Sequence, residues 1–201
     1  LHYATNSGYS EIYVENNNTL VLNADPTEAG SNTSIKFRTD DELAMMIDGA
    51  QRVLIGLTSA EAVAGVTSQL QVAGTTASKA GISATIYSND SDPAIFMFGK
   101  SRSGTVGTEG TIVADGDNIG NINWGADDGT NMAPNLARIS GQIDGAPSEN
   151  DMPGRLVFYT TADGAQTVTE RMRIDSEGQV TITSNRLQIN AGDSGSNHIR
   201  L

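Results

Sequence analysis

Carboxylates are the side chains of this sequence that could do chemistry. Asp and Glu number 24 against 12 Lys and Arg, and two close pairs, Asp115 with Asp117 and Asp127 with Asp128, lie in a glycine-rich stretch. Paired acids can cleave glycosidic bonds, one as general acid and the other as nucleophile or base. Acids between glycines more often form turns, because they accept hydrogen bonds from the local backbone. We therefore assign no catalytic residue and expect no enzymatic activity.

Metal and cofactor chemistry have less support. Residues 115–120 begin like a calcium loop, but the fifth position is Ile119, which has no oxygen ligand. The two histidines, His2 and His198, lie near opposite ends of the chain, away from any serine hydrolase motif. There is no cysteine, and no glycine motif for phosphate or dinucleotide binding occurs. We expect no bound metal and no cofactor.

The composition restricts the partners. A formal net charge of −12 would repel nucleic acid, whose binding needs clustered cationic side chains. No apolar run approaches the roughly 20 residues of a membrane helix, so we expect no membrane insertion. The 37% hydrophobic content, with only 5% aromatic residues and 22 glycines, is typical of short strands joined by turns.

Alternation of apolar and polar residues predicts strands from end to end. In Ile35-Lys36-Phe37-Arg38, for example, the apolar side chains share one face. The expected strands are 11–15, 19–23, 35–38, 43–48, 52–56, 69–72, 82–87, 94–98, 110–113, 121–124, 136–143, 155–160, 171–174, 179–182 and 187–190. One short helix is expected at 58–64, where Thr58 and Glu61 have the spacing of a capping box.

The sequence also repeats itself. Met45-Met46-Ile47-Asp48 aligns with Met172-Arg173-Ile174-Asp175, and a strand resembling 35–39 precedes the second copy at 156–160. We expect a first β-module at 1–64, a divergent β insert at 65–145, a second module at 146–186 and the start of a further module at 187–201. We also expect the chain to be part of a longer protein. Thin modules must bury their apolar face against neighbours or other chains.

Two motifs carry a resemblance to a known family. The segments NDMPGRLVFYTTADG at 150–164 and TERMRIDSEGQV at 169–180 resemble the fibre proteins of tailed bacteriophages. The resemblance covers residues 110–182. In that family the two motifs recur together, sometimes upstream of a self-cleaving intramolecular chaperone domain. The family pattern GNVGIGT stands here as Gly178-Gln179-Val180-Thr181-Ile182-Thr183, without two of its glycines.

The resemblance implies an all-β, elongated, repeat-bearing fibre segment (a β-prism, a β-helix or stacked β-modules) that forms an intertwined homotrimer. It implies a virion location in a tail fibre or spike, contact with other phage tail or virion proteins, and attachment to a bacterial surface glycan. The alternatives are a polysaccharide-degrading tailspike, a capsid head fibre and a cellular adhesin.

Within such a protein, receptor contact is expected on turns, since strand positions are committed to packing. We predict that it falls on residues 110–131, with Trp124, Asp127 and Asp128 as the receptor-binding residues. An indole flanked by carboxylates can stack on a sugar ring. The alternation of Trp124 with Ile122 favours burial of the indole instead. On the strands, Phe37, Met172, Ile174, Val180 and Ile182 are expected to be buried in the oligomer.

Overall fold

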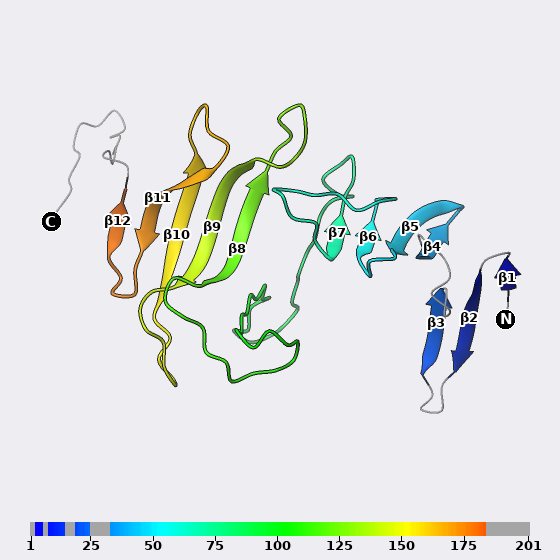
Figure 1. The fold of residues 1–201 in the computed structure, drawn as a ribbon, viewed down its shortest axis with the longest axis horizontal. Coiled ribbons are helices and arrows are strands. Elements are labelled where there is room, and N and C mark those ends of the chain that lie inside the picture. The colour runs from blue at the N-terminus through cyan, green and yellow to red at the C-terminus, as the bar shows by residue number, and fades with distance from the viewer. Residues whose placement is uncertain (1–2, 6–7, 15–18, 25–32, 184–201) are drawn as a thin grey trace. The chain divides into compact units, whose positions relative to one another are not determined.

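The computed structural model describes residues 3–5, 8–14, 19–24 and 33–183 (Figure 1). Every regular element in it is a strand, so the expected all-β class is confirmed for the described residues. The strands are β1 (Tyr3–Thr5), β2 (Gly8–Val14), β3 (Leu20–Ala24), β4 (Ile35–Thr39), β5 (Glu42–Ile47), β6 (Val53–Ile55), β7 (Leu70–Val72), β8 (Asn118–Gly125), β9 (Asn135–Ile143), β10 (Gly154–Thr161), β11 (Val168–Ile174) and β12 (Val180–Ile182). The strand expected at 187–190 and the module start at 187–201 lie outside the described residues, as do His2 and His198.

The chain forms two compact units, Leu1–Ile95 and Phe96–Leu201. The first unit holds two sheets. Strands β1 to β3 form an antiparallel N-terminal sheet, and β4 to β7 form a mixed sheet in which only β6 and β7 run parallel. In the mixed sheet the buried side chains of Met46 and Leu54 are paired across β5 and β6. They form its small core.

The second unit holds one antiparallel sheet, which we call the meander sheet. Its strand order is β12-β11-β10-β9-β8, so every strand pairs with its neighbour in the sequence (Figure 1). Residues 118–143, which fall within the insert expected at 65–145, therefore share a sheet with the strands of the second module. The chain reaches this arrangement through hairpins alone, because antiparallel neighbours need no crossover.

The two copies of the sequence repeat have the same strand pairing. Phe37 pairs with Met45 in the mixed sheet, and Phe158 pairs with Met172 in the meander sheet. In both hairpins the register shifts directly after the phenylalanine, which marks a β-bulge. The aligned residues thus occupy corresponding places in their hairpins.

The turn that follows each copy is also shared. Asp48 and Asp175 accept a hydrogen bond at Oδ1 from the backbone N–H four residues later, at 3.0 and 2.8 Å. The residues three positions after each aspartate, Gln51 and Gly178, have positive φ angles of 64° and 79°. The β5–β6 hairpin and the β11–β12 hairpin therefore both close with a turn that contains one residue of left-handed backbone conformation.

The helix expected at 58–64 is wrong. Val63 and Val66 form an antiparallel bridge, and the residues between them, Ala64 and Gly65, have φ angles of 52° and 76°. Positive φ at both central residues is typical of a type I′ turn, which reverses the chain. This reversal outweighs the capping-box spacing that predicted a helix.

Three segments whose alternation predicts strands are not strands in this structure. Residues 82–87, 94–98 and 110–113 lie in the long connection between β7 and β8, and no described strand pairs with them. Alternation shows that a segment can bury one face. It does not show that the pairing strand belongs to the same chain.

Few hydrophobic side chains are buried. In the described part of the chain they are Met46, Leu54, Val113, Ile143 and Val157. Of the strand residues expected to be buried in the oligomer, Phe37 is 40% and Val180 60% exposed within this one chain. Met172, Ile174 and Ile182 are half-buried. A domain of this length normally buries most of its apolar surface, so one chain alone supplies only a small core.

Candidate functional site

One face of the meander sheet is apolar across its whole width. Residues two apart on a strand share a face, and pairing places them in rows across the sheet. One row is Ile122, Ile139, Phe158, Met172 and Ile182. The next row is Gly120, Gly141, Leu156, Ile174 and Val180. These two rows, with Trp124 beside Ile122, are the apolar face.

The apolar face is only partly covered by the described residues. Ile122 and Leu156 are each 48% exposed. Phe98 covers one corner, where a Cβ on Gly120 would lie 2.4 Å from the Phe98 Cγ atom. A hollow of about 280 Å³ remains between Phe98, Ile139 and neighbouring residues of the apolar face. A contiguous exposed apolar patch is typical of an interaction surface.

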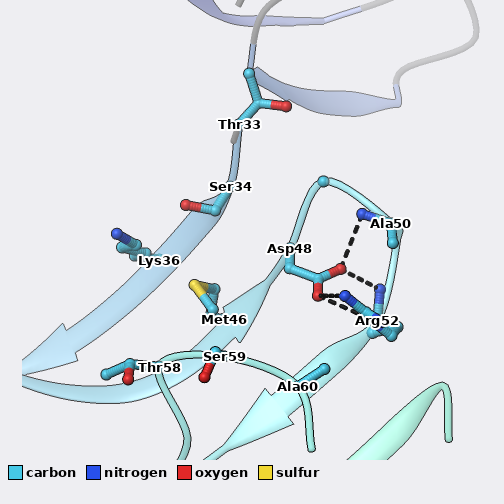
Figure 2. Close-up of a pocket in the computed structure, with 11 residues that line it drawn as sticks. Thr33, Ser34, Lys36, Met46, Asp48, Ala50, Arg52, Thr58, Ser59 and Ala60 are labelled. Atoms are coloured by element: carbon cyan, nitrogen blue, oxygen red, sulfur yellow. Dashed lines mark hydrogen bonds and ion pairs between the residues drawn. The ribbon is translucent and has the colours of Figure 1, made fainter. Parts of the chain in front are cut away.

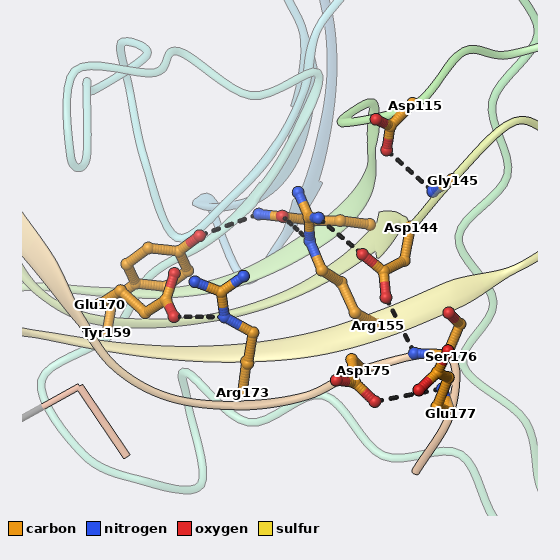
Figure 3. Close-up of polar contacts among 11 residues, drawn as sticks. Asp115, Asp144, Gly145, Arg155, Tyr159, Glu170, Arg173, Asp175, Ser176 and Glu177 are labelled. Carbon is orange, nitrogen blue, oxygen red and sulfur yellow. Dashed lines mark hydrogen bonds and ion pairs between the residues drawn. The ribbon is translucent and has the colours of Figure 1, made fainter. Parts of the chain in front are cut away.

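The opposite, polar face carries a hydrogen-bonded network (Figure 3). Gln142 is buried, donates from Nε2 to the Tyr159 hydroxyl at 2.9 Å, and accepts from Arg155 Nε at 2.9 Å. Arg155 also pairs with Asp144, with 2.8 Å between Nη1 and Oδ1. Because both ends of the buried amide are satisfied, the network fixes the side chains of β9 and β10 in place.

A cation without an ion pair lies beside this network. The Arg138 guanidinium carbon is 4.2 Å from the centre of the Tyr159 ring, which is cation–π geometry. Its buried Nε has no hydrogen-bond partner, and no ion pair to Arg138 occurs among the described residues. Arg173, by contrast, pairs with Glu170 at 2.7 Å. The charges of the polar face are thus mostly neutralised within it.

Asp144 joins the end of β9 to the turn between β11 and β12 (Figure 3). Its Oδ2 accepts a hydrogen bond from the Ser176 backbone N–H at 2.8 Å, while Oδ1 holds Arg155. The Ser176 hydrogen bond and, next, the Arg155 guanidinium lower the pKa of Asp144 from its ordinary value of 3.8. This carboxylate stays ionised at neutral pH and ties three strands together.

The receptor-binding candidates do not form one cluster. Trp124 lies in β8 on the apolar face and is 44% exposed. Asp127 and Asp128 lie in the β8–β9 loop, where their Oδ1 atoms accept hydrogen bonds from backbone N–H groups at 2.8 to 3.1 Å. Backbone hydrogen bonds from Asn131 and Thr130 lower the pKa of Asp128. Both aspartates are exposed and shape their own loop, while the indole belongs to the sheet.

The acids near 115–120 also serve the local structure. Asp117 contacts Arg102 at 2.6 Å and Lys100 at 3.0 Å, and the Arg102 hydrogen bonds hold the pKa of Asp117 well below its usual range. Asp115 accepts a hydrogen bond from the Gly145 N–H at 2.8 Å. Across the described ranges, no group of three or more His, Cys, Asp or Glu side chains is placed to hold a metal ion. None of these described residues forms a helix long and apolar enough to cross a membrane.

The first unit contains a hollow that the sequence did not reveal. It has a volume of about 560 Å³ and lies beside β4 to β6 (Figure 2). Lys36, Met46, Thr58 and Ser59 contribute to its lining, as does the Asp48–Arg52 ion pair at 2.7 Å. The alternation of β4 marks Lys36 as a polar strand position. The hollow itself depends on the course of residues 58–60, where the sequence predicted a helix.

Comparisons with known proteins bear on the fold. No family model matches this chain, and no curated protein matches it. Among solved structures it is similar to the carboxy-terminal domain of the bacteriophage T5 L-shaped tail fibre, with a TM-score of 0.59 and 15% identity over 96% of this chain and 87% of that one. It is also similar to the same domain with its intra-molecular chaperone domain, with a TM-score of 0.59 and 14% identity over 97% of this chain and 60% of that one. The chain therefore has a fold like that of a phage tail-fibre domain.

Proposed function

We propose that this chain is a segment of a bacteriophage tail fibre that works as an intertwined homotrimer and attaches the virion to its host cell. The observation that supports this most is the apolar face of the meander sheet, in a chain whose fold is similar to tail-fibre domains. An oligomer with closed symmetry can cover the same face on every copy at once. Two further copies around a threefold axis would supply the core that one chain lacks.

The trimer is tested by its mass and by a matched pair of variants. Light scattering should give three times the chain mass of 21.0 kDa. Ile122→Glu places a charge on the apolar face, and Asn123→Glu places the same charge on the polar face of the same strand. Burying an unpaired carboxylate costs several kcal/mol or forces the interface apart, so Ile122→Glu should dissociate the trimer.

The control variant should leave the trimer intact, because Asn123 is exposed on the opposite face. Circular dichroism of both variants would show whether the strands remain. A stable, folded monomer of the unchanged chain would contradict the proposal. A trimer that tolerates Ile122→Glu without loss of stability would remove the apolar face as its core.

The location and partners belong to the same proposal. In the virion the segment would join other tail proteins and contact a glycan of the bacterial surface. Antibodies against the chain should label tail fibres in electron micrographs of the intact phage. Label on the capsid would instead identify a head fibre, and absence of label from virions would favour a cellular adhesin.

Host contact is proposed for the β8–β9 loop. Asp127 and Asp128 are exposed there, whereas Trp124 shares the face that the trimer would cover. Replacing both aspartates with Ala should reduce adsorption to host cells while the trimer and its melting temperature persist. Asp163→Ala, an exposed acid in the β10–β11 turn, is the control. Unchanged adsorption of the double variant would remove this loop as the receptor site.

A further inference from the structure

The connection between β7 and β8 contains two segments with the sequence of strands that pair with no described strand. We call residues 82–87 (ISATIY) and 94–98 (AIFMF) the two arms. From residue 81 to residue 101, no backbone N–H or C=O makes a backbone hydrogen bond with any described residue. Buried backbone N–H and C=O groups are almost always hydrogen-bonded. If the arms are buried in an assembly, their backbone must therefore form hydrogen bonds with another chain.

The side chains of the arms are unusually exposed for their type. Tyr87 is 97%, Phe96 79% and Ile82 73% exposed within this one chain. Single exposed hydrophobic residues are ordinary, but a run of large ones marks a surface that something covers. Their composition is β-branched and aromatic, which is typical of strands and not of solvated loops.

The linker between the arms is ordered by its own polar side chains. The Asp90 carboxylate accepts hydrogen bonds from the Ser88 hydroxyl and from the Asp92 backbone N–H, the latter at 3.1 Å. The Ser88 hydroxyl in turn accepts from the Asp90 N–H at 3.2 Å. The linker thus makes a turn, yet no hydrogen bonds join the arms into a hairpin. Each arm keeps its backbone available to another chain.

The same chain also has a strand edge that pairs with no described strand. Strand β8 is the outermost strand of the meander sheet, spans eight residues, and contains no charged residue and no proline. Natural proteins usually guard such an edge with lysine, proline or a short strand, because an open edge pairs with other chains. Within the chain, Phe98 packs against the face of this sheet at Gly120, so the end of the second arm lies over the sheet.

We propose that the two arms are interchain β-strands, whose backbone pairs with the strand edges of a second copy of this chain. The partner is a second copy because the described part of this chain carries both the unpaired arms and the unpaired edge of β8. The arms and β8 are uncharged in a chain of net charge −12, so they are the places where two acidic copies can approach without repulsion. This inference rests on the trimer proposed above and names the segments that intertwine it.

Hydrogen exchange separates this inference from the trimer itself. Within one chain the arm amides have no backbone acceptor among the described residues, so they should exchange like those of a loop. Pairing in the oligomer should slow their exchange by about a thousandfold. Light scattering on the same sample reports the trimer independently. A trimer whose arm amides exchange freely would overturn this inference alone, and a monomer would overturn both proposals.

Proline variants test the backbone directly. Thr85→Pro and Ile86→Pro are made separately because neighbouring amides on a strand point to opposite sides, so at least one must lose an interchain bond. At least one should weaken assembly tenfold or more. Val106→Pro is the control, because Val106 is fully exposed and precedes Gly107 (φ 78°) in the Thr105–Thr108 turn, a position that proline suits. Unchanged assembly of both arm variants would contradict the inference.

A photocrosslink identifies the partner chain. A tagged chain carrying Tyr87→p-benzoylphenylalanine is co-expressed with the untagged normal chain and irradiated. On a denaturing gel, a tagged species of twice the chain mass that contains the untagged chain supports interchain pairing. A tagged species that migrates only as one chain, with no crosslinked pair, would overturn the inference.

Discussion

Gln142 shows how one buried amide fixes its neighbours. Its Nε2 donates to the Tyr159 hydroxyl, and its Oε1 accepts from Arg155. Tyr159→Phe removes the hydroxyl but keeps the ring under Arg138, so the buried amide alone loses its acceptor. We expect this variant to lower the free energy of unfolding by about 1 to 3 kcal/mol.

The matched control is Asn123→Ala, which lies in the same row of the polar face and is exposed. Its effect should stay within about 0.5 kcal/mol. Chemical denaturation at one fixed protein concentration measures both, because the stability of the proposed trimer would depend on concentration. Equal effects of the two variants would show that the Gln142–Tyr159 bond contributes nothing of its own.

Asp144 predicts a loss of stability in acid. Its folded pKa is lower than the ordinary 3.8, so the unfolded chain takes up a proton at a higher pH than the folded chain does. Its contribution is therefore complete above about pH 4 and is lost as the pH falls through the folded pKa. Denaturation from pH 7 to pH 2 should show this decline.

Two variants identify the cause of the decline. Asp144→Asn removes the charge, and Ser176→Pro removes the N–H donor at a turn position where proline fits. Both should flatten the decline below pH 4. If the acid sensitivity of both variants matches that of the unchanged chain, Asp144 is not its source.

The hydrogen-bonded network around Gln142 could not be predicted from the sequence. Asp127 and Asp128 can be recognised in the sequence because they are adjacent and lie between glycines. As expected of turn residues, they accept hydrogen bonds from the backbone of their own loop. Gln142 and Tyr159 are 17 positions apart and meet only through the register of β9 and β10. Pairing register depends on the whole sheet, so no local pattern indicated this contact.

At the scale of elements, Gly120 is the point where the connection from β7 meets the meander sheet. A Cβ there would lie 2.4 Å from Phe98, so Gly120→Ala should displace the ring and cost about 1 to 3 kcal/mol. Gly141 is its cross-strand neighbour, where a Cβ meets nothing within 4 Å. Thermal unfolding of Gly120→Ala and Gly141→Ala compares the two positions. An equal cost would mean that another copy fills the space above Gly141.

The equivalent turns of the repeat predict a reciprocal exchange. Gln51 adopts the same left-handed backbone as Gly178, at a cost that glycine does not have. Gly178→Gln should therefore fold normally but lose about 1 kcal/mol, and Gln51→Gly should gain a similar amount. Melting temperatures would measure both shifts. Failure of Gly178→Gln to fold would show that the two turns are not interchangeable.

Periodicity predicted the strands well where one face is apolar. The residues of β10 and β11 alternate, and their pairing follows the aligned repeat. The same reasoning placed strands at 82–87 and 94–98, where no strand among the described residues pairs with them. An alternating pattern indicates that one face of a segment can be buried. It does not indicate whether the same chain or another molecule covers that face. At 58–64 the failure is different, because a tight turn at Ala64 and Gly65 reverses the chain.

At the scale of the whole molecule, we expect no glycosidase activity from the carboxylates. The acids considered for glycoside cleavage, Asp115, Asp117, Asp127 and Asp128, all accept hydrogen bonds from nearby backbone N–H groups or basic side chains. Purified protein should therefore leave the chain length of host envelope polysaccharide unchanged, as size-exclusion chromatography of the polysaccharide would show. Depolymerisation that disappears after an Asp→Asn change would instead identify a tailspike enzyme.

The neighbour-to-neighbour order of the meander sheet has a consequence for biosynthesis. Contacts between strands that are close in sequence form quickly, so this sheet can fold on each nascent chain before other copies arrive. In the proposed trimer this apolar face is covered only after other copies bind, so each chain would be prone to aggregate before assembly. Refolding yield should rise with protein concentration while assembly outpaces misassociation, and should fall once aggregation dominates. For the proposed trimer, aggregation therefore competes with assembly mainly in the interval between synthesis and the binding of other copies.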